Sequence, residues 1–129
     1  MRKPQVKWLD RRIGPAAPYL TLCLSEDEYL AAMDHIKVFG NTKWAPASGG
    51  RTHHAVNGNG DIVCIVCMDG WLDADLRGIL GLLVHESVHV WQSWCDDYGE
   101  SAPGCEQEAY AIQNISQELI SEFMRRISK

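Results

Sequence analysis

The chain has little positive charge and no long hydrophobic run. Its 129 residues include 12 Lys and Arg against 17 Asp and Glu, for a formal net charge of −5, whereas nucleic-acid-binding proteins usually carry a basic face. No apolar stretch reaches the roughly 20 residues that a transmembrane helix needs, and polar residues interrupt the N-terminus where a signal peptide would be apolar. We therefore expect an intracellular, cytoplasmic protein that binds neither nucleic acid nor membrane.

The five cysteines are an odd number and include one C-x-x-C pair, Cys64 and Cys67. A zinc finger needs a second pair at comparable spacing, and residues three apart on a strand point to opposite faces. Because a chain of this length builds a core without disulfides, we expect mostly reduced and packed thiols. A disulfide between Cys95 and Cys105 remains an alternative.

The length and composition predict one domain, residues 1–129, with an irregular segment over 1–18 that prolines interrupt. Alternating apolar and polar residues predict a strand over 19–25. Ser25 is followed three residues later by a glutamate, a capping-box sequence that begins a helix over about 26–38 and ends it near a glycine. The first part of the chain therefore predicts an irregular segment, one strand and one helix.

The middle of the chain predicts a β-hairpin, and the end predicts two helices. NGNG, 57–60, joins two strand-like runs, and Asn-Gly favours the positive φ of a tight turn. A largely apolar helix is expected over about 73–94, where Gly78 and Gly81 indicate close approach to a neighbour. The last helix is expected over 105–127. We therefore expect an α+β fold with a backing helix, a small mostly antiparallel sheet and two final helices.

The pattern HESVH, residues 85–89, lies inside the expected central helix. His85 and His89 are one turn apart, so their side chains project from one face and can bind one metal ion. Glu86 lies beside the first histidine, where a carboxylate can accept a proton from a metal-bound water. This H-E-x-x-H spacing is typical of zinc hydrolases, and we expect a Zn²⁺ ion here.

A catalytic zinc ion usually has three protein ligands and one open position. The last helix begins with CEQEAYAIQ, which offers Glu106 and Glu108. The two are separated by two steps of about 100° around a helix, about 160° the short way round, so they cannot easily have the same function. Glu108 continues the apolar stripe of the helix, whereas Glu106 aligns with small and polar residues that suit a metal cleft. The spacing leaves both glutamates open.

Together with EQEAY, 106–110, the HESVH pattern resembles the gluzincin arrangement of zinc metallopeptidases, H-E-x-x-H followed by E-x-x-A-[DY] on another helix. The Ala-Tyr form is similar to small zincin-like metallopeptidases of phages and prophages, over about residues 44–125. The resemblance implies a minimal zincin-like fold, Glu106 as the third ligand and hydrolysis of peptide bonds. The aspartate usual after the alanine is Tyr110 here, which leaves the polar partner of the zinc histidines unassigned.

The resemblance also implies a mechanism. Glu86 would accept the proton of a zinc-activated water and pass it to the leaving amine, and Gln92 would orient a ligand or line the cleft. A donor must stabilise the oxyanion, and Tyr98, Tyr110 and His54 are the candidates. The substrate, a peptide or protein, would lie extended along an exposed sheet edge beside the helix.

Two other functions are compatible with the sequence. A zinc-binding scaffold or assembly protein without turnover needs both histidines but no base beside them, so Glu86 argues against it. In the other, HESVH is a polar patch and no metal binds. His53 and His54 point to opposite faces of a strand, so we expect a structural or surface role for this pair, with His54 preferred if one reaches the cleft.

Overall fold

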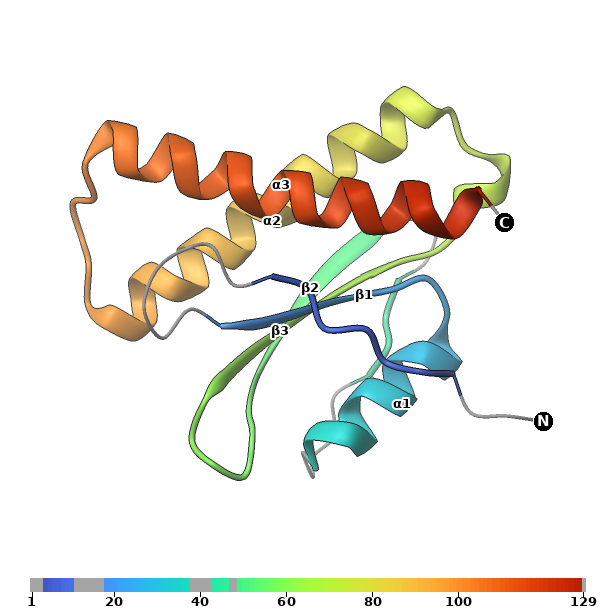
Figure 1. The fold of residues 1–129 in the computed structure, drawn as a ribbon, viewed down its shortest axis with the longest axis horizontal. Helices are drawn as coiled ribbons and strands as arrows, with labels where there is room; N and C mark the ends of the chain where they lie inside the picture. The colour runs from blue at the N-terminus through green and yellow to red at the C-terminus, as the bar shows by residue number, and fades with distance from the viewer. Residues whose placement is uncertain (1–3, 11–17, 38–42, 47–48, 129) are drawn as a thin grey trace.

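The computed structural model describes residues 4–10, 18–37, 43–46 and 49–128. This part of the chain forms a mixed α/β fold with three helices and a three-stranded sheet (Figure 1). The elements, in chain order, are β1 (Tyr19–Cys23), α1 (Glu26–Ile36), β2 (Gly50–Val56), β3 (Ile62–Met68), a 3-10 turn (Trp71–Asp73), α2 (Leu76–Tyr98) and α3 (Cys105–Ile127).

The sheet has the strand order β1-β3-β2 and is mixed. β3 pairs in parallel with β1, so that Tyr19 lies opposite Val63, and antiparallel with β2, so that Gly50 lies opposite Met68. The expectation of a mostly antiparallel sheet is therefore wrong for one of the two pairings. The hairpin turn fixes the local β2–β3 pairing, whereas α1 and β2 lie between β1 and β3 and let the chain return in the same direction.

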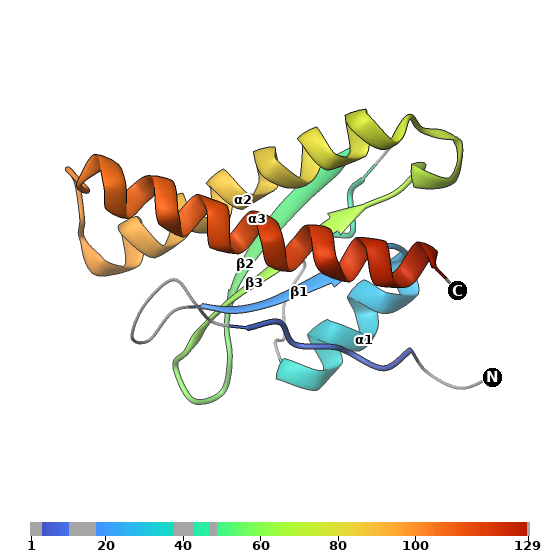
Figure 2. The same cartoon turned by 45° about the horizontal axis from the view of Figure 1, so that its top comes forward.

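The central strand β3 carries the core on both of its faces. One side, with Cys64, Val66 and Met68, packs with α2 and α3, and the other, with Val63 and Ile65, packs with α1. Figures 1 and 2 show the result: α2 and α3 cover one face of the sheet, and α1 lies on the other. The continuous apolar run of β3 reflects this burial on both sides.

The helix ends follow local signals. Ser25 Oγ accepts a hydrogen bond from Glu28 N at 3.3 Å, which confirms the predicted cap, although the Glu28 carboxylate bonds Leu24 N instead of completing the box. Lys37 is the C-cap of α1 in the left-handed region, and the end expected at Gly40 lies outside the described residues. The helix expected from about residue 73 begins at Leu76, because residues 71–73 form a separate turn; α3 has the bounds that were predicted.

The two glycines of α2 do not mark close packing. A Cβ added at Gly78 or Gly81 would have no neighbour within 4 Å, so the expectation of close approach is wrong. The close approach occurs on the sheet side, where a Cβ at Gly50 would lie 3.1 Å from the Leu82 side chain. The sequence could not show this contact, because it depends on how β2 crosses α2.

Because Gly78 lies in an exposed helix interior, Gly78→Ala is expected to stabilise the protein by about 0.5–1 kcal/mol. Gly99 is the matched control on the same helix, since its φ of 67° places it in the left-handed C-cap. We expect Gly99→Ala to destabilise the protein by about 1 kcal/mol. Urea unfolding monitored by circular dichroism measures both, and a loss of stability in Gly78→Ala would contradict the exposure of this position.

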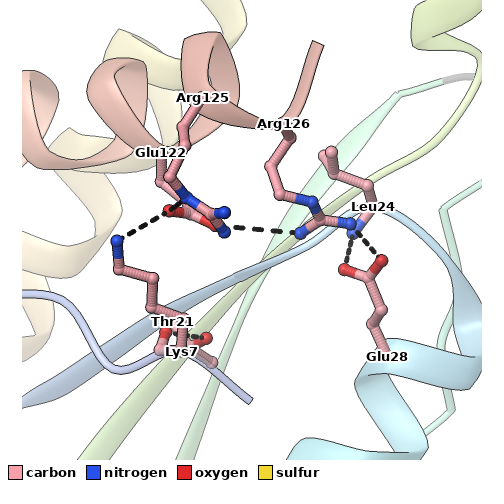
Figure 3. A network of polar contacts seen from close by, with 7 residues as sticks. All are labelled: Lys7, Thr21, Leu24, Glu28, Glu122, Arg125 and Arg126. Atoms are coloured by element: carbon pink, nitrogen blue, oxygen red, sulfur yellow. Dashed lines mark hydrogen bonds and ion pairs between the residues drawn. The ribbon is translucent and has the colours of Figure 1, made fainter. Parts of the chain in front are cut away.

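A buried carboxylate, Glu122 of α3, connects three parts of the chain (Figure 3). Arg125 donates to its two oxygens at 2.9 and 2.6 Å, and Lys7 Nζ lies 3.5 Å from Oε1. Arg126 lies 3.9 Å from Oε2 and also pairs with Glu28 of α1. Burial alone would raise the pKa of Glu122, but these cations lower it below its ordinary value. The cluster joins the N-terminal segment, α1 and α3.

All five cysteines are free thiols, so the alternative of a Cys95–Cys105 disulfide is not realised in the structure. Cys105 is exposed, and the other four are buried. Burial raises the pKa of Cys64 to about 11, and a hydrogen bond to Cys23, together with burial, raises that of Cys67. Four of the five thiols are therefore packed in the interior, as expected from the sequence for most of them, and Cys105 is the exception.

We expect Ellman's reagent at pH 8 to modify one thiol per native chain rapidly, Cys105, because the thiolate is the reactive form and the buried thiols have limited access. Unfolding in guanidinium should release the remaining four. Cys105→Ser should abolish the rapid phase and leave circular dichroism unchanged. A rapid phase of two or more thiols in the native protein would contradict the observed burial.

Within the ranges described above, no helix combines the length and the apolar character that crossing a membrane requires.

Candidate active site

The histidine pair lies in the middle of α2, on the side of the helix that is open to solvent. His85 and His89 are both exposed, and their ring centroids are 5.0 Å apart with an interplanar angle of 76°. The helical spacing that predicted a common face is therefore confirmed. Two accessible imidazoles at this separation are a suitable donor pair for a divalent transition metal.

Gln92 fixes the orientation of the second histidine. Its Oε1 lies 3.0 Å from His89 Nδ1, and a carbonyl oxygen accepts only, so Nδ1 is the donor in this contact. The lone pair of the imidazole is then on Nε2, the atom that remains available for a metal ion. Gln92 therefore contacts one of the two histidines predicted to bind metal.

Glu86 points in a different direction from the two histidines, into the contact between α2 and β2. It is 3% exposed, and its Oε1 accepts a hydrogen bond of 2.8 Å from Thr52 Oγ1. A buried carboxylate with a single hydroxyl donor is incompletely compensated for its lost hydration. The carboxylate is therefore held by a tertiary contact between α2 and β2, away from the two imidazoles.

β2 runs alongside α2 in the same direction (Figure 2). Gly50 approaches Leu82, Thr52 bonds Glu86, and, further along, His54 contacts Ser93. β2 is also an edge strand of the sheet. The other edge, β1, is accompanied by the N-terminal segment, where Leu9 N donates to Leu20 O at 2.8 Å.

The two adjacent histidines of β2 have different surroundings, as the strand period predicted. His53 is buried, its Nε2 lies 3.2 Å from Trp44 O, and its ring packs against that of Tyr29 with the centroids 4.6 Å apart and the planes tilted by 35°. His54 faces α2, with Nδ1 2.5 Å from Ser93 Oγ. Burial lowers the pKa of His54, His89 lowers it further, and Asp96 raises it. His54 is therefore on the side of the histidine pair, and His53 is part of the packing under α1.

The two candidate third ligands lie on α3, and the structure does not bring either to the histidine pair. Glu108 Oε2 accepts from Trp91 Nε1 at 2.9 Å, and Trp91 lies about 160° around α2 from His89. Glu106 is exposed in the first turn of α3, about 160° around that helix from Glu108. Throughout the described ranges, no three His, Cys, Asp or Glu side chains are grouped closely enough to bind one metal ion.

The three candidates for the oxyanion donor lie in different parts of the structure. Tyr98 stacks on Trp94 at 4.9 Å, and Trp94 stacks on Trp91 at 5.0 Å, so these rings form a column on the side of α2 that contacts α3. Tyr110 is 61% exposed on α3. Of the three candidates, His54 is the one whose pKa is affected by a member of the histidine pair, His89.

Thr52 and Ser93 are the polar residues of this region that the sequence analysis did not identify. Thr52 and His54 are two residues apart on a strand, and this spacing would have placed both on one face of the hairpin. Ser93 is one turn beyond His89, and nothing in the sequence distinguishes it from other small residues on the inner side of a helix.

A comparison of the chain with protein-family models, curated proteins and solved structures finds no match.

Proposed function

We propose that the chain is a zinc-dependent metallopeptidase of the zincin type. The observation that carries this proposal is the pairing of two exposed imidazoles, 5.0 Å apart, with a buried carboxylate from the intervening sequence position. The pair fits a metal ion by its chemistry, because His89 has its Nε2 free while Gln92 occupies Nδ1. When bound, zinc would supply an acidified water and polarise the scissile carbonyl.

The roles of the protein's own residues follow from their positions. Thr52 fixes one oxygen of the Glu86 carboxylate, which leaves the other oxygen to accept a proton and pass it to the leaving amine. His54 is the proposed oxyanion donor: a Ser93 hydroxyl that donates to Nδ1 leaves the imidazole proton on Nε2. The edge of β2 would hold the substrate as an added strand, beside Glu86.

The third ligand is assigned by resemblance to Glu106. Glu106 is separated from the histidine pair in the structure. The first turn of α3 would therefore have to approach the histidine face of α2 when metal binds. Glu108 is less suitable, because its carboxylate is the acceptor for the buried Trp91 indole and its removal would leave a donor unpaired. A non-catalytic zinc-binding scaffold is the second candidate, and it is favoured by the separation of both glutamates from the histidine pair.

The first test is zinc content per chain by elemental analysis, on protein purified without a histidine tag and dialysed against limiting zinc. The variants are His89→Ala, Glu106→Gln and Glu108→Gln, with His35→Ala as control because His35 lies on α1, across the sheet. We expect one zinc per wild-type chain, retained in His35→Ala and Glu108→Gln and lost in His89→Ala and Glu106→Gln.

The same samples, incubated with a fluorogenic peptide library, separate the two candidate functions. Zinc-dependent hydrolysis supports the peptidase, whereas bound zinc without turnover of any peptide or protein tested supports the scaffold. Absence of zinc in the wild type after zinc is supplied would overturn both. Loss of zinc in Glu108→Gln alone would keep the metal site and transfer the third position to Glu108.

A further inference from the structure

A pocket of about 450 Å³ lies where the C-terminal half of β2 meets α2, directly beyond the candidate active site. Its walls include His54 and Val56 of β2, Ile62 of β3, and Asp96 and Asp97 near the end of α2. The pocket therefore combines aliphatic walls from the hairpin with carboxylates from the helix. None of these residues is used in the fold's ion-pair cluster around Glu122.

The two carboxylates are placed unfavourably for the fold itself. Asp96 and Asp97 lie in the last turn of α2, which has no basic residue, and negative charge at a helix C-terminus opposes the helix dipole. Among the residues that the structure describes, neither carboxylate is in an ion pair with Lys or Arg. Within the described part of the chain, these two acids give the pocket a negative charge that favours the binding of a cationic group.

The pocket lies on the path that an extended peptide would follow along β2. The contacts between strand and helix advance together, from Thr52 at Glu86 to His54 at Ser93, and the pocket comes next. A peptide paired with the β2 edge near Glu86 would reach the pocket about two to four residues further along. The pocket is thus positioned to receive one substrate side chain.

We propose that this pocket selects peptide substrates that carry a Lys or Arg side chain on one side of the scissile bond. The proposal rests on the proposed peptidase function. The methylene groups of the basic side chain would pack on Val56 and Ile62, since long charged side chains cover apolar surface with their stems. Its cationic end would pair with Asp96 and Asp97.

The test is peptide binding without turnover, by fluorescence polarisation on zinc-supplied Glu86→Gln protein. The probes are labelled, blocked octapeptides of Ala and Ser in which a single Lys, norleucine or Glu is moved through every position. At low salt we expect one position at which Lys binds about tenfold more tightly than Glu, with norleucine between them. Wild-type protein with the same peptides, unlabelled, measures hydrolysis separately.

Asp96→Asn combined with Asp97→Asn should remove most of the preference for Lys over Glu at that position. Glu26→Gln combined with Asp27→Asn, both in the exposed first turn of α1 across the sheet, is the matched control for net charge and should keep the preference. A preference that survives the double substitution, equal binding of all peptides, or no binding of any would overturn the pocket assignment. Hydrolysis without a preference for Lys would overturn the pocket assignment and support the peptidase function. A preference for Lys without bound zinc or hydrolysis would overturn the peptidase function and support the pocket as a binding site for basic side chains.

Discussion

Replacing Glu86 with Gln is expected to lower kcat/KM for peptide hydrolysis by about 10²- to 10⁴-fold, the usual contribution of a general base. The amide has nearly the shape of the carboxylate and still accepts the hydrogen bond from Thr52, but it cannot accept the proton of water. The histidine pair is unchanged, so zinc content should equal that of the wild type. Because one buried charge is removed, we expect unfolding by urea to occur at the same or higher denaturant concentration.

Thr52→Val is the companion variant for this prediction. It removes the donor to Glu86 but leaves the carboxylate, so we expect a smaller loss of kcat/KM, about tenfold. Activity of Glu86→Gln within twofold of the wild type, measured with purified and zinc-loaded protein, would exclude Glu86 as the base. A loss of zinc in Glu86→Gln would instead indicate that the substitution disturbs the metal site.

Glu122→Gln is expected to lower the free energy of unfolding at pH 7 by about 2–3 kcal/mol. The carboxylate is almost fully buried and accepts two hydrogen bonds from Arg125, with Lys7 close by; its neutralisation leaves these cations without their partner. Urea titrations followed by circular dichroism measure the difference. Glu118→Gln on the same helix is the control, since its Oε1 accepts from a backbone N–H in an exposed contact, and we expect a change below about 0.5 kcal/mol.

The effect of Glu122 should depend on pH in a defined direction. The cations around Glu122 lower its pKa in the folded protein below the ordinary value, so its ionisation stabilises the folded state above the pKa of the unfolded chain. This contribution is lost as the pH falls from that value through the lower folded pKa. The difference between wild type and Glu122→Gln should therefore shrink on acidification. A difference that is constant from pH 7 to pH 3 would show that packing, not charge, accounts for it.

The sequence predicted those features that depend on neighbours in the chain. The Ser25 cap, the Asn-Gly hairpin and the common face of His85 and His89 all follow from spacing within a few residues. The parallel pairing of β1 with β3 depends on how the chain returns after α1, which no local pattern encodes. The sheet is therefore mixed, with one parallel and one antiparallel pairing, where a mostly antiparallel sheet was predicted.

In the candidate site, too, the sequence predicted the local features and not the tertiary contacts. The histidines and Glu86 come from one helix turn, and the sequence identified them together. The contact of Glu86 with Thr52, and the packing of α3 through Glu108 and Trp91 on the side of α2 away from the histidines, are tertiary contacts between distant residues. Helical periodicity did place Glu108 on the apolar stripe of α3. It could not show which side of α2 this stripe would contact.

The open edge of β2 has a consequence for how the protein behaves at high concentration. A strand edge with unpaired backbone groups can pair with the same edge of another molecule and begin aggregation. Here the short length of the strand, seven residues, limits such pairing. The exposed Arg51 on the same strand adds a positive charge, and charged side chains on an edge strand disfavour its pairing with another chain. The edge that could accept a substrate strand is thus protected against accepting another copy of itself.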